Sequence, residues 1–162
     1  MAKKKSWREK VNDVEEKIHQ ITPEWEEKLG KGNILIPNAI DIERLIKNTK
    51  KGELLTNDII RELLAKEKKV QLTAAIPTGV YLKYVALAAE EEREAGKSNI
   101  TPYWRVLKPD GTINIKFPVP VDKLIKLLES EGHKIELGKG KKPPKVIDFE
   151  KKLKTTAKKK RH

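Results

Sequence analysis

The chain has 162 residues, a net charge of +12 and no cysteine. This length fits one domain with extensions, and the absence of cysteine excludes disulfides, thiol chemistry and thiolate metal sites. Its three dispersed histidines lack ligand spacing, and no apolar run is long enough to span a bilayer or to form a signal peptide, so we expect a soluble, cytoplasmic protein with no metal and no cofactor.

Residues 1–30 are predicted to form a basic, helical N-terminal extension. Residues 3–10 are a polar lead in which Trp7 is expected to dock on the domain. Residues 11–29 indicate helical pieces interrupted at Thr22-Pro23, where threonine can cap a helix and proline can begin one.

The next segment combines a short extended run with three predicted helices. Residues 34–36 are extended and apolar, and the spacing of apolar residues in 41–47 predicts a short helix. Thr56 or Asn57 can cap a second helix, and a third begins near Pro77-Thr78 and ends before Gly96. The last two helices together predict a helix-turn-helix.

The C-terminal half alternates strand and helix signals. Residues 104–108 and 112–116 predict two strands around the turn Pro109-Asp110-Gly111. A hairpin after a helix-turn-helix indicates a winged helix, although the order of elements also allows an unrelated α+β domain. Residues 122–131 predict a helix, and residues 133–137 and 145–149 predict a last antiparallel pair joined by a basic loop.

The predicted fold class is therefore α+β. It consists of a winged helix-turn-helix domain with a β-hairpin wing over residues 31–150, which includes an extra C-terminal hairpin. Basic flexible ends flank this domain, and the second of them is the tail 151–162.

The segment Pro102-Tyr103-Trp104-Arg105-Val106 resembles the Pro-Cys-His-Arg-Val segment of the alkylguanine DNA alkyltransferases. Tyr103 stands in place of the alkyl-accepting cysteine and Trp104 in place of the activating histidine. Thr78-Gly79 lies where the family's recognition helix begins, and residues 127–133 resemble its Leu-Leu-x-x-Glu-Gly-His segment. The likeness runs from about residue 52 to about residue 133, and it is closest to the cysteine-free alkyltransferase-like proteins.

Alkyl transfer needs a thiolate and a neighbouring base, so the resemblance implies a non-enzymatic protein of DNA repair. Such a protein would recognise alkylated or distorted DNA and pass it to a repair-pathway protein. Asn57 and the segment 74–78 lack the tyrosine and the arginine with which the family rotates and extrudes a base. We therefore expect nucleic-acid binding more firmly than base flipping.

Several residues near these motifs have two interpretations. Tyr103 and Trp104 either stack on an extruded base or belong to the core, and Arg105 either contacts phosphate or fixes a loop. Thr78, Gly79 and Lys83 lie near a helix N-terminus, where backbone N–H groups favour phosphate.

The positive charge is concentrated at the two ends and in one loop. Residues 1–10, 139–145 and 151–162 carry net charges of about +4, +4 and +7, while residues 11–138 carry about −1. These lysines either neutralise phosphates or only increase solubility. The predicted nucleic-acid contacts are Thr56, Asn57, Thr78, Gly79, Lys83, Tyr103, Trp104, Arg105, Lys108, Lys139, Lys141, Lys142, Lys158, Lys159, Lys160 and Arg161.

The sequence leaves a second function open. Lysine-rich ends and a nearly neutral body also fit an RNA-associated structural or regulatory protein, for example one bound to the ribosome. We expect a monomer that binds DNA, with RNA or the ribosome as the alternative partner and no membrane contact.

Overall fold

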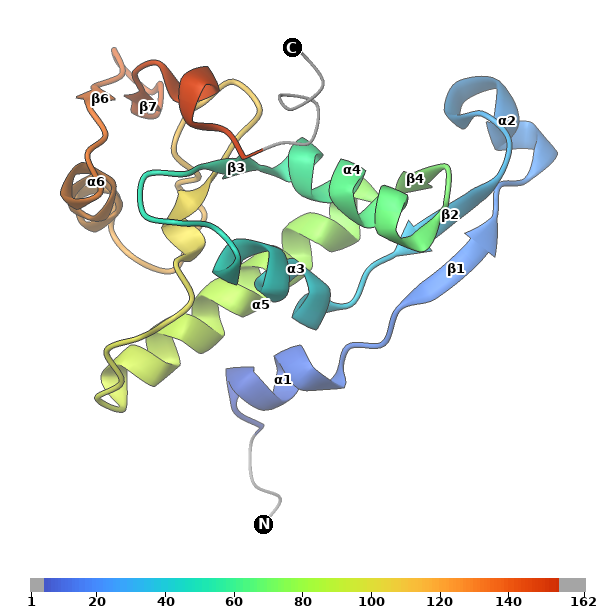
Figure 1. The fold of residues 1–162 in the computed structure, drawn as a ribbon, viewed down its shortest axis with the longest axis horizontal. Helices are drawn as coiled ribbons and strands as arrows, with labels where there is room; N and C mark the ends of the chain where they lie inside the picture. The colour runs from blue at the N-terminus through green and yellow to red at the C-terminus, as the bar shows by residue number, and fades with distance from the viewer. Residues whose placement is uncertain (1–4, 155–162) are drawn as a thin grey trace.

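The computed structural model describes residues 5–154 and has the predicted α+β fold (Figure 1). In chain order its elements are α1 (Trp7–Asp13), β1 (Lys17–Gln20), α2 (Pro23–Leu29), β2 (Asn33–Ile36), α3 (Ala39–Lys47), β3 (Leu55–Thr56), α4 (Asn57–Lys68), β4 (Leu72–Thr73), α5 (Ala75–Glu94), β5 (Val106–Leu107), α6 (Val121–Ser130), β6 (Ile135–Glu136) and β7 (Lys145–Val146). Two 3-10 helices, η1 (Tyr103–Arg105) and η2 (Phe149–Lys152), precede β5 and follow β7.

Helix α1 begins at Trp7, within the segment 3–10 that the sequence analysis described as a polar lead, and runs into the predicted helical segment that follows. Ser6 and Glu9 make a capping box: the Glu9 N–H donates to Ser6 Oγ over 3.1 Å, and the Ser6 N–H donates to the Glu9 carboxylate over 3.1 Å. Trp7 docks on the body as expected, in an edge-to-face contact with Tyr84 at 5.3 Å between ring centroids.

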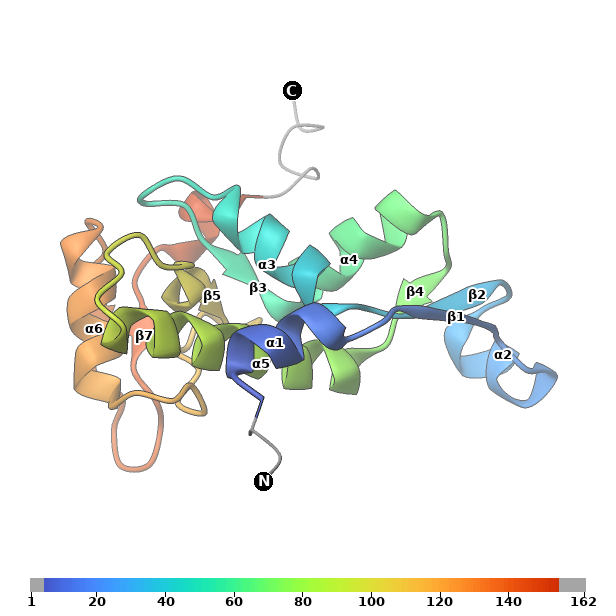
Figure 2. The same ribbon diagram turned by 90° about the horizontal axis from the view of Figure 1, so that it is seen from below.

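Strand β1 corrects the prediction of helix for residues 11–29. It pairs antiparallel with β2, which in turn pairs parallel with β4. All four residues of β1 are exposed, so the sequence carries no apolar alternation that could reveal a strand. Helix α2 begins as predicted, with Thr22 as N-cap and Pro23 in the first helical turn. Together β1, α2 and β2 form an arm that projects from one end of the molecule (Figures 1 and 2).

Helix α5 is the central helix of the body. Helices α1 and α3 pack along it, and α4 contacts it as well (Figure 2). Its buried side includes Leu82, Val85 and three alanines, and these small side chains suit close helix packing. No helix within residues 5–154 combines the length and apolar character that a membrane span needs.

The predicted wing is a turn rather than a two-stranded hairpin. Strand β5 pairs in parallel with β3 instead of with residues 112–116, where only Thr112 makes a bridge, to Lys145. Both residues of β5 are buried, as is usual for a parallel strand covered on both faces. The two runs predicted as wing strands on either side of Pro109-Asp110-Gly111 therefore do not form a strand pair with each other.

The predicted C-terminal hairpin is confirmed, with shorter strands. Ile135 lies opposite Val146, and Glu136 lies opposite Lys145. After η2 the chain returns to β3: the Leu54 N–H donates to the Lys152 carbonyl over 2.9 Å, and the Lys154 N–H donates to the Leu54 carbonyl over 2.8 Å. Residues 151–154, predicted as the start of the tail, thus pair with the body, and the domain boundaries at 30 and 150 stay predictions.

Candidate nucleic-acid interface

A groove of about 430 Å³ opens between the start of α4, the first turns of α5 and the segment that follows β5. It gathers four of the predicted contact residues. Its lining is Asn57 from α4, Ala75, Ile76, Gly79, Val80 and Lys83 from α5, and Lys108, Asn114, Lys116 and Phe117 from the segment after β5.

The parallel pairing of β3 and β5 brings Asn57 and Lys108 to the same wall of the groove. Thr56 lies opposite Leu107 in the register, so the next residue of each strand emerges at the same end of the pair. Asn57 begins α4 immediately after β3, and Lys108 begins the turn immediately after β5. These two residues are 51 positions apart in sequence, and only the strand pairing makes them neighbours.

The exposed face of α5 supplies the floor of the groove. Ile76, Gly79, Val80 and Lys83 follow the three- and four-residue spacing that places side chains on one helix face. A Cβ added to Gly79 would meet only Asn57 Nδ2, at 4.0 Å, which is ordinary contact. The packing of the protein therefore does not require glycine at this position, although glycine inside a helix costs about 0.5–1 kcal/mol.

The turn after β5 is held rigidly. The Gly111 N–H donates to the Lys108 carbonyl over 2.8 Å, and the Lys108 N–H donates to the Thr112 carbonyl over 3.0 Å. The Asp110 carboxylate accepts hydrogen bonds from the Thr112 hydroxyl and N–H, at 2.7 and 3.0 Å, and these bonds lower its pKa. Lys108 is thus presented from a fixed backbone.

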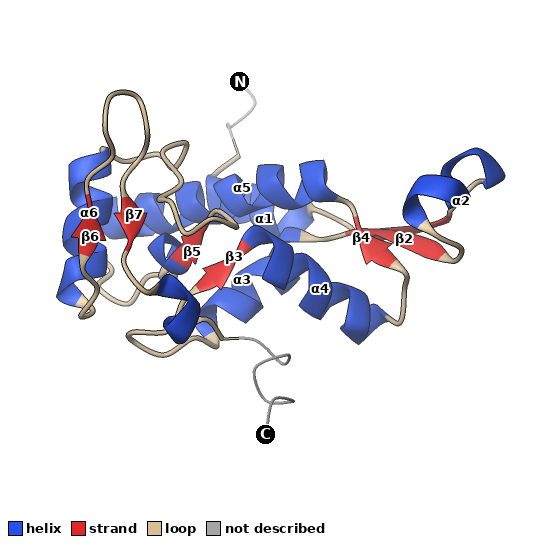
Figure 3. Ribbon diagram, turned by 90° about the horizontal axis from the view of Figure 1, so that it is seen from above, coloured by secondary structure: helices blue, strands red, loops and turns tan. Residues whose placement is uncertain are grey.

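The basic loop between β6 and β7 adjoins this turn. The Ile113 N–H donates to the Pro144 carbonyl over 2.8 Å, and a second hollow, of about 560 Å³, is lined by Asp110 and Thr112 together with Lys139, Lys142 and Lys145. Figures 2 and 3 show this loop on the side of the molecule that carries α5, with α3 and α4 on the other side. The groove and the loop therefore form one face.

This face is rich in unpaired positive charge. Lys83, Lys108 and Lys116 are exposed, and none of them forms an ion pair with another described residue. Lys139, Lys141 and Lys142 are exposed in the loop. Lys158, Lys159, Lys160 and Arg161 lie outside the described residues.

Tyr103 lies behind the groove and does not line it. Its side chain is fully buried, and its hydroxyl donates to Glu90 Oε2 over 2.6 Å. Burial first, and then the Glu90 hydrogen bond, raise the pKa of this phenol above its usual range. Its ring packs edge-to-face on Phe117, at 5.0 Å, and on Trp104, at 5.4 Å. The geometry favours the core interpretation over stacking on a base.

Four other predicted contacts are also turned inward. The Arg105 guanidinium binds the Glu131 carboxylate at 2.7 and 2.9 Å and donates to the Thr49 carbonyl over 2.8 Å. Thr78 is buried, and its hydroxyl donates to the Ala74 carbonyl over 2.7 Å.

Trp104 is partly buried, and its Nε1 has no partner among the described residues. Thr56 is 2% exposed, and it stands at the N-cap of α4 without making a side-chain cap. The sequence motifs gave the positions of Arg105, Thr78, Trp104 and Thr56 along the chain. They did not reveal that the side chains of these residues point away from the groove.

The groove also contains residues that sequence reasoning did not select. Asn114 and Lys116 were assigned to a wing strand, and Ile76 and Val80 carry no charge that would mark them. Their only sequence signal is position, within a few residues of Gly79 and Gly111. Within residues 5–154, no three histidine or carboxylate side chains are grouped so that they could hold a metal ion.

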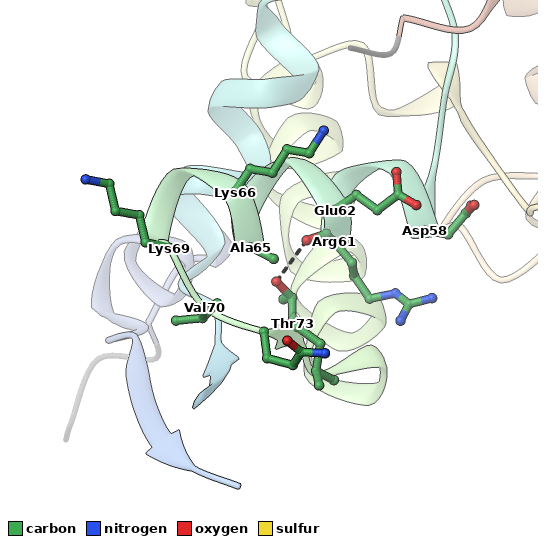
Figure 4. A pocket seen from close by; sticks show the side chains of 10 residues that line it. Asp58, Arg61, Glu62, Ala65, Lys66, Lys69, Val70 and Thr73 are labelled. Carbon is green, nitrogen blue, oxygen red and sulfur yellow. Dashed lines mark hydrogen bonds between the residues drawn. The ribbon is translucent and has the colours of Figure 1, made fainter. Parts of the chain in front are cut away.

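A separate hollow, of about 400 Å³, lies between α4 and β4 (Figure 4). It combines acidic Asp58 and Glu62 with basic Arg61, Lys66 and Lys69, and the Thr73 hydroxyl donates to the Arg61 carbonyl over 2.9 Å beside it. The two carboxylates offset two of the three positive charges, whereas the lysines of the groove have no acidic residue in its lining, so the groove favours a polyanion more strongly.

The α+β core and the α4–α5 helix pair define the class of fold, and comparison with solved structures agrees. The fold is similar to that of the S. pombe ATL crystallised in complex with DNA, with a TM-score of 0.52 and 16% sequence identity over 72% of this chain and 94% of that chain. S. pombe Atl1 in complex with damaged DNA containing O6-carboxymethylguanine gives a TM-score of 0.47 and 14% identity over the same shares of the two chains.

No protein-family model and no curated protein sequence matches the chain. The alkyltransferase-like fold that the sequence motifs predicted is confirmed by the first of these structures.

Proposed function

We propose that this protein binds DNA through the groove and the adjacent basic loop, and that it recognises alkylated or distorted DNA without transferring an alkyl group. The observation that carries the proposal is the groove itself, where unpaired lysines surround the exposed face of α5. The similar S. pombe ATL was crystallised in complex with DNA, which supports DNA as the ligand of this fold.

The proposed binding mode follows from the placement of charge. The first turns of α5 enter a groove of the duplex, and no side chain caps the N–H groups at the start of this helix, which are therefore available to phosphate. Lys108 and the basic loop lie along the sugar-phosphate backbone. Lysine contacts with phosphate supply affinity without sequence preference.

The absence of alkyl transfer follows from the chemistry of the side chains. The chain has no cysteine, and the residue at the predicted acceptor position, Tyr103, is a buried phenol held protonated by its surroundings. Such a protein leaves the lesion intact, so its task in repair is to mark the lesion for a partner protein.

The proposal is tested by titrating the full chain against four labelled ligands at two salt concentrations. The ligands are a short DNA duplex, the same duplex with one alkylated guanine, matched single-stranded DNA and a structured RNA. We expect the alkylated duplex to bind best and to keep its alkyl group after incubation. Preferential binding of the RNA would instead support the ribosome-associated alternative.

Lysine variants test the groove directly. Lys83→Ala and Lys108→Ala should each weaken binding to all duplexes alike and reduce the slope of log affinity against log salt by about 0.9, the value for one lost phosphate contact. Lys31→Ala, on the projecting arm, is the matched control and should change neither. Equal behaviour of the three variants would remove the groove as the binding site.

A further inference from the structure

The projecting arm of β1, α2 and β2 has an apolar hollow of its own (Figures 1 and 2). Trp25, in the first turn of α2, is 52% exposed at this hollow, and Ile18 on the adjacent strand is 46% exposed. The hollow has a volume of about 310 Å³ and is lined by Gln20, Ile21, Thr22, Trp25, Leu29 and Ile34. It shares no residue with the groove at α5, so the arm is a separate surface.

Strand β1 beside the hollow is an open edge of the three-stranded sheet. The sheet order is β1-β2-β4, so no described strand pairs with the outer side of β1. The Ile21 N–H donates to the Gly32 carbonyl over 2.8 Å, and the antiparallel register continues from this pair. Because backbone groups alternate in such a ladder, those of Ile18 and Gln20 point outward. Proline, bulges or covering segments protect many sheet edges, and β1 has no proline and is exposed at all four residues.

The size of this surface suits an extended peptide segment better than a second copy of the chain. Stable dimer interfaces bury about 1,200–2,000 Å² in total, whereas β1 has only four residues and the hollow is small. Two copies would also repel each other, because each has a net charge of +12. A peptide that adds a strand to a sheet edge gains affinity from main-chain hydrogen bonds and selectivity from a pocket for one of its side chains.

Charge complementarity identifies the segment as a basic one. Trp25 is flanked in α2 by Glu24, Glu26 and Glu27, and none of these carboxylates forms an ion pair with another described residue. The face of a tryptophan ring also attracts cations, and Lys28 Nζ lies 5.8 Å from the centre of the Trp25 ring. Unpaired carboxylates repel phosphate, so this surface favours a lysine- or arginine-containing peptide over nucleic acid.

We propose that the arm is a docking site for an extended, basic segment of another protein. The segment pairs with the outer edge of β1, places one large apolar side chain in the hollow and sets its basic side chains beside Trp25 and the three glutamates of α2. This inference goes beyond the proposed function. The arm uses no residue of the groove and precedes residue 52, where the sequence likeness to the alkyltransferases begins.

The test begins with a displayed library of random peptides of about twelve residues, which is longer than an average strand. Peptides that bind the full-length wild-type protein are kept, and those that also bind Trp25→Ala are removed. We expect the enriched peptides to have a net positive charge and to alternate apolar with polar residues, including one large apolar side chain. The most enriched peptide is then synthesised and titrated by fluorescence anisotropy.

Variants of the protein separate the apolar and the charged parts of the site. Trp25→Ala should weaken binding of the synthesised peptide by about tenfold or more. The double variant Glu24→Gln, Glu27→Gln preserves side-chain size and should weaken it by about fivefold at about 0.05 M salt and by much less at about 0.5 M. Leu137→Ala, at an exposed apolar residue outside the arm, and Lys83→Ala, in the groove, are controls that should bind the peptide as wild type does.

Methylation of the peptide backbone tests strand addition without changing the protein. Two versions of the peptide carry methyl groups on alternate amide nitrogens, in opposite phase. One version should lose binding, because its methylated amides are those that pair with β1, and the other should bind nearly as well as the parent. Thermal melts of the protein variants should match wild type. The glutamine variant and the methylated peptides test the site even if Trp25→Ala loosens the arm.

Several results would overturn the inference. Among them are a selection in which no peptide prefers wild type to Trp25→Ala, enriched peptides that are acidic or neutral, and two methylated peptides that bind alike. A dimer that is seen by sedimentation and lost in Trp25→Ala would assign the arm to a second copy of the chain. A large loss of duplex DNA affinity in Trp25→Ala would assign it to nucleic acid. The proposed function is tested separately, by the duplex titrations of Lys83→Ala and Lys108→Ala.

Discussion

Tyr103 connects three parts of the molecule through one side chain. Its hydroxyl reaches Glu90 in α5, and Glu90 also lies 3.2 Å from Arg93 and 3.7 Å from Lys123 of α6. The ring packs edge-to-face on Phe117 in the segment that follows β5. The position at which the resemblance suggested an alkyl acceptor is thus occupied by a side chain that holds helices together.

Removing this side chain should destabilise the fold. Tyr103→Ala should lower the free energy of unfolding by about 3–5 kcal/mol, because it leaves a cavity in the core. Tyr103→Phe is the control, and it should cost about 1.5–3 kcal/mol, the value of a hydrogen bond to a charged group. Urea denaturation measures both. A Tyr103→Ala protein that unfolds like wild type but has lost its preference for modified DNA would restore the base-stacking role.

Glu43 is an acidic residue at the centre of a second network. It is 3% exposed, accepts hydrogen bonds from the Arg8 guanidinium at 2.7 and 2.8 Å, and accepts one from the Thr101 hydroxyl at 2.9 Å. Burial alone would raise the pKa of this carboxyl, but the bonds from Arg8 and Thr101 outweigh burial and lower it. The ionised form of Glu43 therefore stabilises the folded state.

The sign of the pH dependence follows from this lowered pKa. The contribution of Glu43 is fully present above its unfolded pKa of about 4.3 and is lost as the pH falls through the lower folded pKa. Glu43→Gln should cost about 3 kcal/mol of unfolding free energy at pH 7 and show a shallower decline below about pH 4. Glu94→Gln, an exposed control, should leave the acid profile unchanged. Parallel acid profiles for wild type and Glu43→Gln would contradict the assignment.

At the scale of elements, the turn after β5 depends on Gly111 for two reasons. Its φ is +87°, in the region that favours glycine, and an added Cβ would lie 2.3 Å from Phe149 Cδ1. Gly96 has a similar φ of +92° but has nothing within 4 Å of an added Cβ. The two glycines therefore separate backbone strain from steric conflict.

We expect Gly96→Ala to cost about 1 kcal/mol of unfolding free energy from backbone strain alone. Gly111→Ala should cost about 2–4 kcal/mol, because the clash with Phe149 is added to the strain. It should also weaken DNA binding by displacing Lys108, whereas Gly96→Ala should not. Equal costs for the two variants would mean that η2 moves aside easily and that the turn is not fixed by Phe149.

The elements with strong local signals could be predicted from the sequence. Helices α3, α4 and α6 have apolar faces at helical spacing, and the C-terminal hairpin is marked by its proline- and glycine-rich loop. Strand β1 could not be predicted, since its residues are exposed on both faces. The parallel pairing of β5 with β3 could not be predicted either, because two strands that lie so far apart in the sequence leave no local signal of their pairing. The start of helix α1 at Trp7 could have been predicted from the Ser6–Glu9 capping box, but the sequence analysis placed the helical pieces only from residue 11 on.

The residues of the candidate site were also only partly predictable from the sequence. Asn57, Gly79, Lys83 and Lys108 were selected from helix starts and turns, and the structure brings them to one groove. Tyr103, Arg105 and Thr78 were selected from the same motifs and are buried. Motifs give the position of a residue along the chain, whereas burial depends on what packs against it from distant segments.

At the scale of the whole molecule, a deletion that tests the basic tail has to begin after residue 154. Lys152 and Lys154 are hydrogen-bonded to Leu54, so a deletion that begins at residue 151 would damage the body. A deletion of residues 155–162 removes four basic side chains and leaves these bonds intact.

This deletion should leave the unfolding free energy unchanged and weaken binding to every nucleic acid by a similar factor. The salt slope on duplex DNA should fall by up to about 0.9 for each lysine or arginine that contacts phosphate. Replacing the four basic residues by serine in the full-length chain controls for the loss of length. An unchanged slope would show that the tail serves only solubility.

Both ends of the folded body are fastened to segments far away in the sequence. The N–H groups of Trp7 and Arg8 donate to the Glu91 carboxylate at 3.1 and 3.4 Å, and Leu54 exchanges hydrogen bonds with Lys152 and Lys154. During translation, α1 is made long before α5 exists, and β3 emerges long before its last partner. The nascent chain therefore cannot close either contact early, and folding of this body is completed only after residue 154 has been synthesised. A stop codon at position 151 would remove both hydrogen-bond partners of Leu54 and leave this closing contact unmade.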